Sequence, residues 1–201
     1  FNSLEFLVFL PVFFCIYWLL AKRIRLQNAA VVVASYIFYG WWDWRFLILI
    51  AISSLCAYAS GLLIQKYEGS VKKQKAINVI NVVINLGILG FFKYFNFFLD
   101  ALGGLFGIHN TVSLNLIIPL GVSFYTFQSL SYVFDVYRGV IPVEKDGLKL
   151  MAYLSFFPQI TSGPIVKARS FLPQLDRVHR IQKENVYAGI QLFLLGLTKK
   201  V

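Results

Sequence analysis

Long apolar runs separated by short basic segments decide what this chain can fold into. One run covers residues 4–20 and another residues 46–64, and Lys or Arg follows each of them closely. At about 1.5 Å of rise per residue, a helix of either length comes close to the roughly 30 Å hydrocarbon core of a bilayer. Inside lipid, backbone polar groups must be paired within the protein, and a helix achieves this within one segment. The pattern therefore predicts an all-α, polytopic transmembrane protein.

The composition argues against a water-soluble domain. Hydrophobic residues make up 58% of the 201 residues and charged residues only 14%, with 20 Phe, 11 Tyr and 4 Trp. A soluble protein of this size could not bury so much aromatic surface. The net charge of +10 lies in short clusters between apolar runs, so we expect the lipid bilayer as a partner and no nucleic acid. Cys15 and Cys56 lie in apolar runs without a neighbouring His, which suggests neither a disulfide framework nor a metal site.

Further spans are expected along the chain. They lie at residues 29–39 and 76–92, weakly at 93–107, and from residue 186 onward. The Trp-rich residues 40–45 are expected to form a turn at the membrane interface. Because no repeat, linker or low-complexity segment divides the sequence, residues 1–201 are predicted to form a single membrane domain.

The basic residues are shared unevenly between the loops. Lys22, Arg23 and Arg25 follow the first run and residues 66–75 are rich in Lys, whereas Arg45 stands alone in the loop between. Positive charge favours the cytoplasmic side of a membrane. We therefore expect the first and third loops to be cytoplasmic and the N-terminus to be extracytoplasmic.

One expected span carries amide side chains on a single face. Asn78, Asn81 and Asn85 recur at helical spacing. Polar side chains at membrane depth form hydrogen bonds between helices. This face should therefore point away from lipid and toward neighbouring helices.

The last third of the sequence is interrupted by helix-breaking residues. Pro119 and Gly121 stand near the start of the apolar residues 116–139, and Pro158 and Gly163-Pro164 follow a second apolar run. Such breaks are tolerated in a membrane only where protein or water satisfies the backbone. We therefore predict broken or re-entrant helices here.

An interfacial helix is predicted after these breaks. Phe171, Leu175, Val178 and Ile181 can share one helical face, and basic residues occupy the other positions. This pattern is typical of an amphipathic helix that lies in the plane of the membrane interface.

A polar stripe follows Gly121. Tyr125, Gln128, Tyr132 and Asp135 recur at spacings that place them on one helical face, and Arg138 lies one turn after Asp135 as a possible ion-pair partner. Two interpretations stay open. In the first, the stripe forms hydrogen bonds between helices, and an Asp–Arg pair anchors the helix end. In the second, the stripe lines a substrate passage, as ionisable groups at membrane depth often do.

A second candidate site surrounds the later breaks. Gln159, Thr161 and Ser162 precede Gly163 and Pro164. Irregular backbone buried in a membrane exposes N–H and C=O groups that can bind a ligand. The alternative is a re-entrant turn needed only for packing.

Histidine is the usual general base near neutral pH. His109 lies in a short polar loop and His179 in the basic amphipathic stretch, and neither context favours a catalytic role. The sequence also shows no nucleophile elbow, phosphate-binding loop or metal-ligand spacing.

Several short strings stand out as motifs. They are residues 118–128 (IPLGVSFYTFQ), 135–139 (DVYRG), 156–158 (FFP) and 162–165 (SGPI). Together they resemble the membrane-bound O-acyltransferase family. Residues 38–43 (FYGWWD) and 196–201 (GLTKKV) resemble its alginate O-acetyltransferase branch. The resemblance extends along essentially the whole chain.

The resemblance implies a multi-pass enzyme of the bacterial inner membrane. Such an enzyme moves an acyl group, usually acetyl, from a cytoplasmic acyl thioester such as acetyl-CoA to a hydroxyl of an extracytoplasmic glycan or cell-envelope polysaccharide. An extracytoplasmic partner protein is a further expectation. The residues expected to shape the substrate passage are Tyr125, Gln128, Tyr132, Asp135, Arg138, Gln159, Gly163 and Pro164.

The family's catalytic histidine belongs to a Trp-His segment well downstream, and no such segment occurs here. The chain begins at Phe1 and ends after Lys199 and Lys200 inside an apolar segment, so we expect the N-terminal portion of a longer domain, inactive alone. Members acting on alginate often carry His at the position of Gln159, which weakens the case for alginate as the acceptor. The alternatives are a membrane transporter or channel, which also uses broken helices, and a non-catalytic membrane scaffold.

Overall fold

The two longest helices are α3 (Phe46–Lys66) and α4 (Val71–Phe106), and both are rich in apolar residues. The computed structural model describes residues 4–106, 121–160, 163–178 and 181–200, and every regular element in these ranges is helical. The whole of α3 and residues Val71–Tyr94 of α4 are long and apolar enough to cross a membrane. The all-α prediction is therefore confirmed for the described part of the chain.

The other elements are shorter. They are α1 (Leu4–Leu19), α2 (Ile24–Asp43), α5 (Val122–Tyr137), α6 (Gly147–Ser155), α7 (Phe157–Ile160), α8 (Ala168–Phe171), the 3₁₀ helix η1 (Leu172–Asp176) and α9 (Lys183–Lys200).

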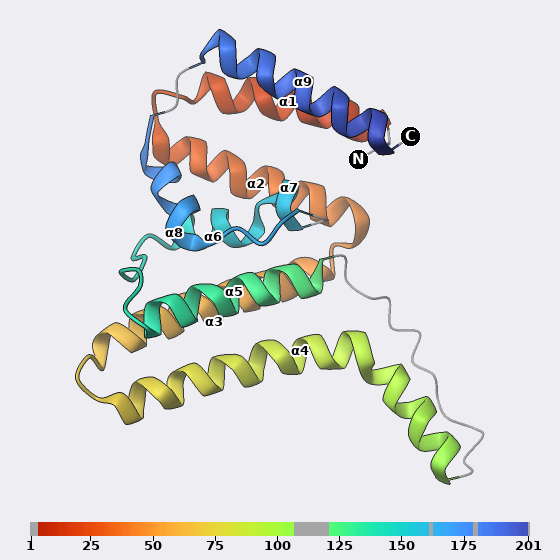
Figure 1. The fold of residues 1–201 in the computed structure, drawn as a ribbon, viewed down its shortest axis with the longest axis vertical. Coiled ribbons are helices and arrows are strands. Elements are labelled where there is room, and N and C mark those ends of the chain that lie inside the picture. The colour runs from red at the N-terminus through yellow and green to blue at the C-terminus, as the bar shows by residue number, and fades with distance from the viewer. Residues whose placement is uncertain (1–3, 107–120, 161–162, 179–180, 201) are drawn as a thin grey trace.

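The helices stack in layers, as Figure 1 shows. α3, α4 and α5 pack against one another, and α2 packs on α1, α3 and α6. The short α7 lies against α2 and α5. Buried apolar side chains fill the space between α2, α5 and α6, with Tyr132, Val133 and Tyr153 almost inaccessible to solvent. The short helices α6 and α7 thus lie between α2 and α5.

The predicted amide face of α4 is buried against α3. Asn81 and Asn85 are each only 1% exposed. The Ser53 hydroxyl of α3 donates to Asn85 Oδ1 at 2.8 Å, and Asn85 Nδ2 donates to Asn81 Oδ1 at 2.6 Å. The prediction that this face forms hydrogen bonds to a neighbouring helix is confirmed for Asn85, whereas Asn78 Oδ1 and Asn81 Nδ2 have no partner among the described residues.

Replacing Asn85 by leucine should lower the free energy of unfolding by about 1–2 kcal/mol, because it leaves the buried Ser53 hydroxyl and Asn81 amide without this partner. Thermal unfolding of the purified full-length protein in detergent measures the change. The control is Leu86→Ala one position further, where the side chain is 43% exposed. An Asn85→Leu protein as stable as the wild type would contradict the prediction.

The interfacial turn expected at residues 40–45 is shorter than predicted. α2 continues to Asp43, and only Trp44 and Arg45 separate it from α3. Gly40 is a packing position and not a turn position, since a Cβ there would lie 3.2 Å from Leu47 Cδ1. The Asp43 carboxylate accepts from the Arg45 backbone N–H at 3.0 Å and pairs with its guanidinium. These contacts close the tight turn.

The separate weak span expected at residues 93–107 does not form. Residues 93–106 continue α4 as one helix, and Figure 1 shows a bend in its second half. The segment contains no proline, and each glycine within a helix costs only about 1 kcal/mol relative to alanine. Gly103 and Gly104 are therefore insufficient to end the helix.

The predicted interfacial helix through residues 171–181 is wrong. The segment forms the last residue of α8, then η1, and residues 177, 178, 181 and 182 are not helical. Pro173 stands within η1 and lacks the N–H that a continuing α-helix needs. Phe171 and Leu175 are buried, whereas Val178 is 57% and Ile181 60% exposed. The four apolar residues therefore do not share a face.

Candidate functional site

The polar stripe of α5 faces the protein interior. Tyr125 is 1% exposed, Gln128 2% and Tyr132 0%, whereas Phe127 on the opposite side is 46% exposed. The spacing of the polar residues had predicted that they share one face, and the structure buries this face against α6, α7 and the neighbouring long helices. The stripe is thus part of the protein core and is not a lipid-facing surface.

Gln128 connects α5 to the broken segment formed by α6 and α7. Its Nε2 donates to the backbone oxygen of Tyr153 in α6 at 2.8 Å and to Gln159 Oε1 in α7 at 3.4 Å. The two glutamines come from the two candidate sites that the sequence predicted separately. The structure brings them together in one partly buried polar contact.

At the break between α6 and α7, a freed backbone N–H finds its hydrogen-bond partner in a serine of α2. The Phe157 backbone N–H donates to Ser35 Oγ at 3.2 Å, and that hydroxyl donates to the Val31 carbonyl at 2.7 Å. Buried backbone groups that a helix break leaves unpaired need such partners. The predicted break is therefore real, and its backbone is partly paired with another helix.

Two glycines hold the broken segment close to its neighbours. Gly121 has φ of 72°, and a Cβ there would lie 2.4 Å from the Ile160 carbonyl oxygen and 2.6 Å from the Tyr39 hydroxyl. Gly163 donates its N–H to the Gln159 carbonyl at 2.9 Å, and a Cβ there would lie 2.7 Å from Gln159 Cα. Only glycine fits either position without displacing backbone.

Several polar atoms of α5 have no hydrogen-bond partner in the described part of the chain. They are the Tyr125 hydroxyl, Ser129 Oγ and Asp135 Oδ2, all of them buried. Tyr125 belongs to the same buried cluster as Tyr39 and Ile160. Buried polar groups normally find a partner. These atoms are therefore free to bind a substrate group, water or another part of the full-length protein.

The suggested ion pair between Asp135 and Arg138 does not form among the described residues. Arg138 is the exposed residue that follows the last turn of α5. Asp135 Oδ2 is buried and unpaired. The end of α5 instead places Arg138 at the surface and turns the carboxylate inward.

Other candidate residues lie away from the Gln128–Gln159 contact. Tyr132 accepts a hydrogen bond from the Glu144 backbone N–H at 3.1 Å, and a Cβ on Gly61 would lie 3.0 Å from its hydroxyl. Pro164 is exposed. Tyr132 thus holds the loop after α5 against α3.

Sequence reasoning missed Tyr153 and Tyr39. Tyr153 is fully buried, accepts the Gln128 amide at its carbonyl and donates its hydroxyl to the Val166 carbonyl at 2.8 Å. Both tyrosines lie in aromatic-rich stretches where nothing distinguishes them from ordinary core residues. The only signal is that a tyrosine hydroxyl in an apolar run needs a partner.

The described residues supply no nucleophile paired with a histidine. His109 and His179 lie outside the described residues, as do Pro119, Thr161 and Ser162. Within the described ranges no group of three or more His, Cys, Asp or Glu residues could hold a metal ion. The Gln128 and Tyr125 side chains can donate and accept hydrogen bonds, so they suit the positioning of a bound group.

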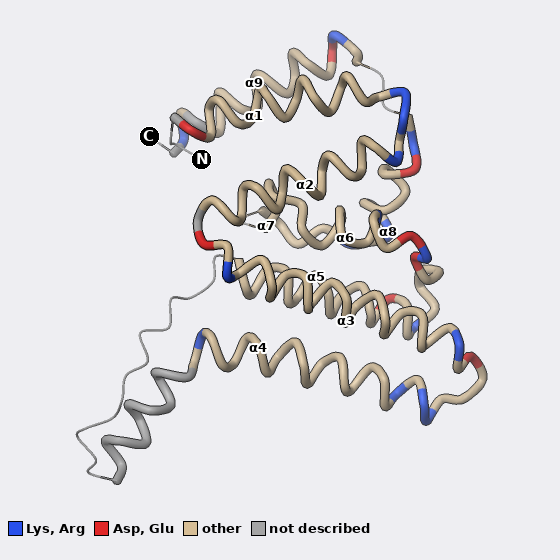
Figure 2. The backbone as a smooth tube through the Cα atoms, turned by 180° about the vertical axis from the view of Figure 1, so that it is seen from behind, with Lys and Arg blue, Asp and Glu red and all other residues tan. Residues whose placement is uncertain are grey.

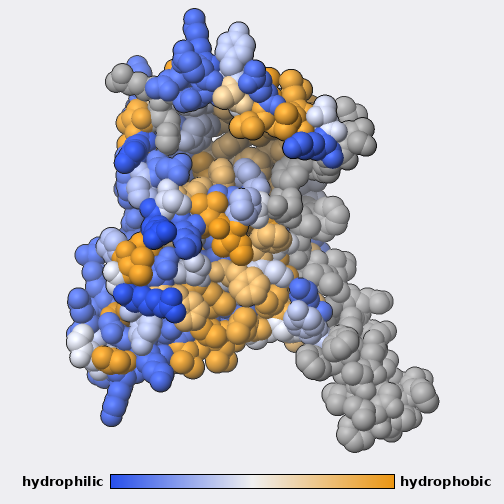
Figure 3. All heavy atoms as spheres, viewed as in Figure 1, coloured by the Kyte–Doolittle hydropathy of each residue, from blue (hydrophilic) through white to orange (hydrophobic). Residues whose placement is uncertain are grey.

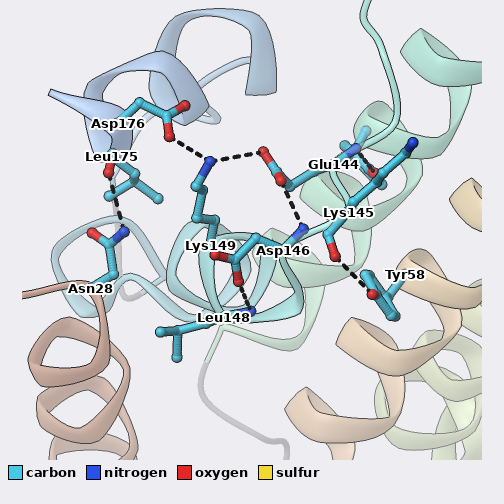
Figure 4. A network of polar contacts seen from close by, with 10 residues as sticks. Asn28, Tyr58, Glu144, Lys145, Asp146, Leu148, Lys149, Leu175 and Asp176 are labelled. Carbon is cyan, nitrogen blue, oxygen red and sulfur yellow. Dashed lines mark hydrogen bonds and ion pairs between the residues drawn. The ribbon is translucent and has the colours of Figure 1, made fainter. Parts of the chain in front are cut away.

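A charged network stabilises one end of the bundle, as Figure 4 shows. Lys149 of α6 pairs with Asp176 of η1 and lies 3.7 Å from Glu144 Oε2. The contact with Asp176 raises the pKa of Lys149 above its usual value. The network ties the loop after α5 to α6 and η1.

Lys149→Met should lower the free energy of unfolding by less than about 1 kcal/mol at neutral pH, because the pair with Asp176, whose side chain is 54% exposed, is partly screened by water. The raised pKa of Lys149 stabilises the fold below the lysine pKa of the unfolded chain, and this contribution disappears as pH rises through the folded-state pKa. Thermal unfolding of both proteins across alkaline pH measures the effect. Lys145→Met, at an exposed side chain, is the control, and equal effects of the two substitutions at neutral pH would contradict the prediction.

Comparisons with known proteins give a consistent result over the whole chain. A probable alginate O-acetylase AlgI of Pseudomonas aeruginosa is 36% identical over 206 residues, which cover 100% of this chain and 39% of that protein. Its counterpart in Azotobacter vinelandii is also 36% identical and is covered to 40%. A peptidoglycan O-acetyltransferase of Helicobacter pylori is 30% identical over 231 residues, with 100% of this chain and 44% of that protein covered. The chain thus spans well under half of these relatives and corresponds to their N-terminal part.

No family model and no solved structure matches the chain.

Proposed function

Because this chain is homologous along its whole length to the alginate O-acetylases, we propose that it is the N-terminal part of a membrane-embedded O-acetyltransferase. The enzyme transfers acetyl from a cytoplasmic acyl thioester such as acetyl-CoA to a hydroxyl of an extracytoplasmic glycan. The homology to proteins named for two different polysaccharides carries this proposal. It favours acetyl transfer over the transporter, channel and scaffold alternatives.

The proposed location is the bacterial inner membrane, with a polytopic topology in which residues 1–201 belong to one membrane domain. Support comes from α3 and α4, which are long and apolar enough to span a bilayer. Lys22, Arg23 and Arg25 lie at the junction of α1 and α2, and Lys66, Lys72, Lys73 and Lys75 lie at the adjoining ends of α3 and α4. This alternation supports a cytoplasmic location of these two junctions and an extracytoplasmic N-terminus. α6 and α7 are too short to span the membrane and form a broken element within the bundle.

The proposed role of the Gln128–Gln159 contact is to shape the passage where donor and acceptor meet. The contact is partly buried, with Gln128 only 2% exposed, and it joins α5 to α7. The inward-facing Tyr125 hydroxyl lies on the same face of α5 and has no partner in the described chain. Gly163 keeps the segment after α7 tight against Gln159. Fixed polar groups of this kind position a reacting hydroxyl or carbonyl.

The chemistry is acyl transfer. The sugar hydroxyl oxygen attacks the thioester carbonyl carbon while a base removes the hydroxyl proton. The tetrahedral oxyanion is stabilised by hydrogen-bond donors and collapses to an ester, and the thiol leaves with a proton. By the family resemblance, the base is a histidine supplied from outside the residues of this chain.

Membranes that carry the full-length protein test the proposal. We expect label from radioactive acetyl-CoA to appear as alkali-labile ester on envelope glycan, and not in membranes of the same cells without the protein. An appropriate negative control is acetyl-CoA with the glycan fraction removed. No difference between the two membrane preparations, with the protein verified as inserted, would refute acetyl transfer from this donor to these glycans.

A further inference from the structure

An apolar groove of about 410 Å³ runs between α1 and α2. Its walls include Phe9, Val12 and Ile16 of α1 and Leu26, Ala30 and Val33 of α2. Figure 3 shows a hollow at the level of these two helices. All residues that line the groove are apolar, so it offers no site for a polar substrate.

The groove is open to its surroundings. Val12 is 53%, Val33 56% and Ile37 54% exposed. Small residues at Ala29, Ala30 and Ala34 leave space on the α2 side. A slot of this kind can receive a hydrocarbon chain, whose burial is favoured by contact with apolar walls.

One end of the groove meets a cluster of cations. Leu20 and Leu26, which line that end, flank Lys22, Arg23 and Arg25 in sequence. These basic side chains are exposed, and none forms an ion pair within the described ranges. Figure 2 shows the blue segment at the turn that joins α1 to α2. Gln27 Nε2 donates to the Tyr17 carbonyl at 3.2 Å and keeps the two helices together beside this turn.

We propose that an anionic phospholipid occupies this groove. One acyl chain lies between α1 and α2, and the phosphate binds Lys22, Arg23 and Arg25. The juxtaposition of an all-apolar slot with unpaired cations at its end matches the two halves of such a lipid. A transmembrane helix would fill the slot but would leave the cations without a counter-charge. The inference concerns lipid binding and holds whether or not the protein transfers acetyl groups.

Native mass spectrometry of the full-length protein, released from nanodiscs of phosphatidylcholine and phosphatidylglycerol, tests this inference. We expect wild-type protein to retain phosphatidylglycerol in preference to phosphatidylcholine. The triple variant Lys22→Gln, Arg23→Gln, Arg25→Gln should reduce that preference at least about tenfold. The matched control is Lys72→Gln, Lys73→Gln, Lys75→Gln at the basic start of α4, which should retain the lipid as the wild type does.

A second variant separates the groove from simple charge attraction. Ala30→Trp fills the slot and leaves the three cations in place, so it should also lose the retained phosphatidylglycerol. Equal retention by Ala30→Trp and wild type, or by the triple variant and wild type, would overturn the proposal. Efficient disulfide cross-linking of an Ala30→Cys protein to a second copy would overturn it as well, because the groove would then be covered by protein.

Discussion

Replacing Gly121 by alanine should lower the free energy of unfolding by about 3 kcal/mol and reduce the amount of inserted protein. The residue has φ of 72°, a left-handed conformation that costs other residues about 1 kcal/mol or more. A Cβ there would lie 2.4 Å from the Ile160 carbonyl oxygen, so α5 would have to move away from α7, at a further cost of about 1–3 kcal/mol. Thermal unfolding in detergent and the yield of folded protein measure the change.

The matched control is Gly139→Ala. Gly139 has a similar φ of 68°, but a Cβ there would meet nothing within 4 Å. We expect this substitution to cost only the conformational part, about 1 kcal/mol. If the two variants were equally stable, the close approach of α5 to α7 and α2 would not matter for the fold.

Replacing Gln128 by leucine should reduce acetyl transfer about a hundredfold in protein that remains folded and inserted. Leucine removes the two hydrogen bonds that Gln128 makes to α6 and α7, at 2.8 Å and 3.4 Å. Without them Gln159 is free to move, and misplacement of a positioning group by about 1 Å can cost two orders of magnitude in rate. The rate of transfer per inserted protein is the measurement.

Two comparisons make this result specific. Phe127→Leu, one position earlier on the 46% exposed face, should leave transfer nearly unchanged. Gln159→Leu should impair transfer, and adding it to Gln128→Leu should cause little further loss because the two side chains act through one contact. Additive losses would show that the glutamines act independently. A fully active Gln128→Leu protein would show that the polar stripe of α5 serves only helix packing.

The sequence predicted much of the helical framework because strong periodic patterns decide it locally. The apolar run at residues 46–64 became α3 with nearly the same limits. The spacing of Asn78, Asn81 and Asn85 identified a face that the structure buries and pairs with Ser53. The face of α5 with Tyr125 and Gln128 was likewise identified from spacing alone. Each of these inferences depends on the geometry of one helix.

The incorrect or missing predictions depend on contacts between distant residues. Gln128 and Gln159 are on separate helices, so no local pattern indicates that they meet. Gly121 was expected as a helix break, but its close approach to Ile160 and Tyr39 follows only from the packing of α5, α7 and α2. The amphipathic pattern of Phe171 to Ile181 was misleading because Pro173 turns the chain into a short 3₁₀ helix. A periodic pattern cannot overcome a missing backbone donor.

Vectorial transfer by the purified full-length protein in sealed proteoliposomes tests the central proposal most directly. Radioactive acetyl-CoA is supplied only on the face that carries Lys22, Arg23 and the basic start of α4, and a glycan acceptor only on the opposite face. We predict labelled ester on the glycan with the wild-type protein. Transfer should be lost in Gln128→Leu and nearly unchanged in Phe127→Leu. Unlabelled glycan with wild-type protein, in vesicles shown to be sealed and correctly oriented, would contradict the assignment of this chain to an acetyl-CoA-dependent transfer across the membrane.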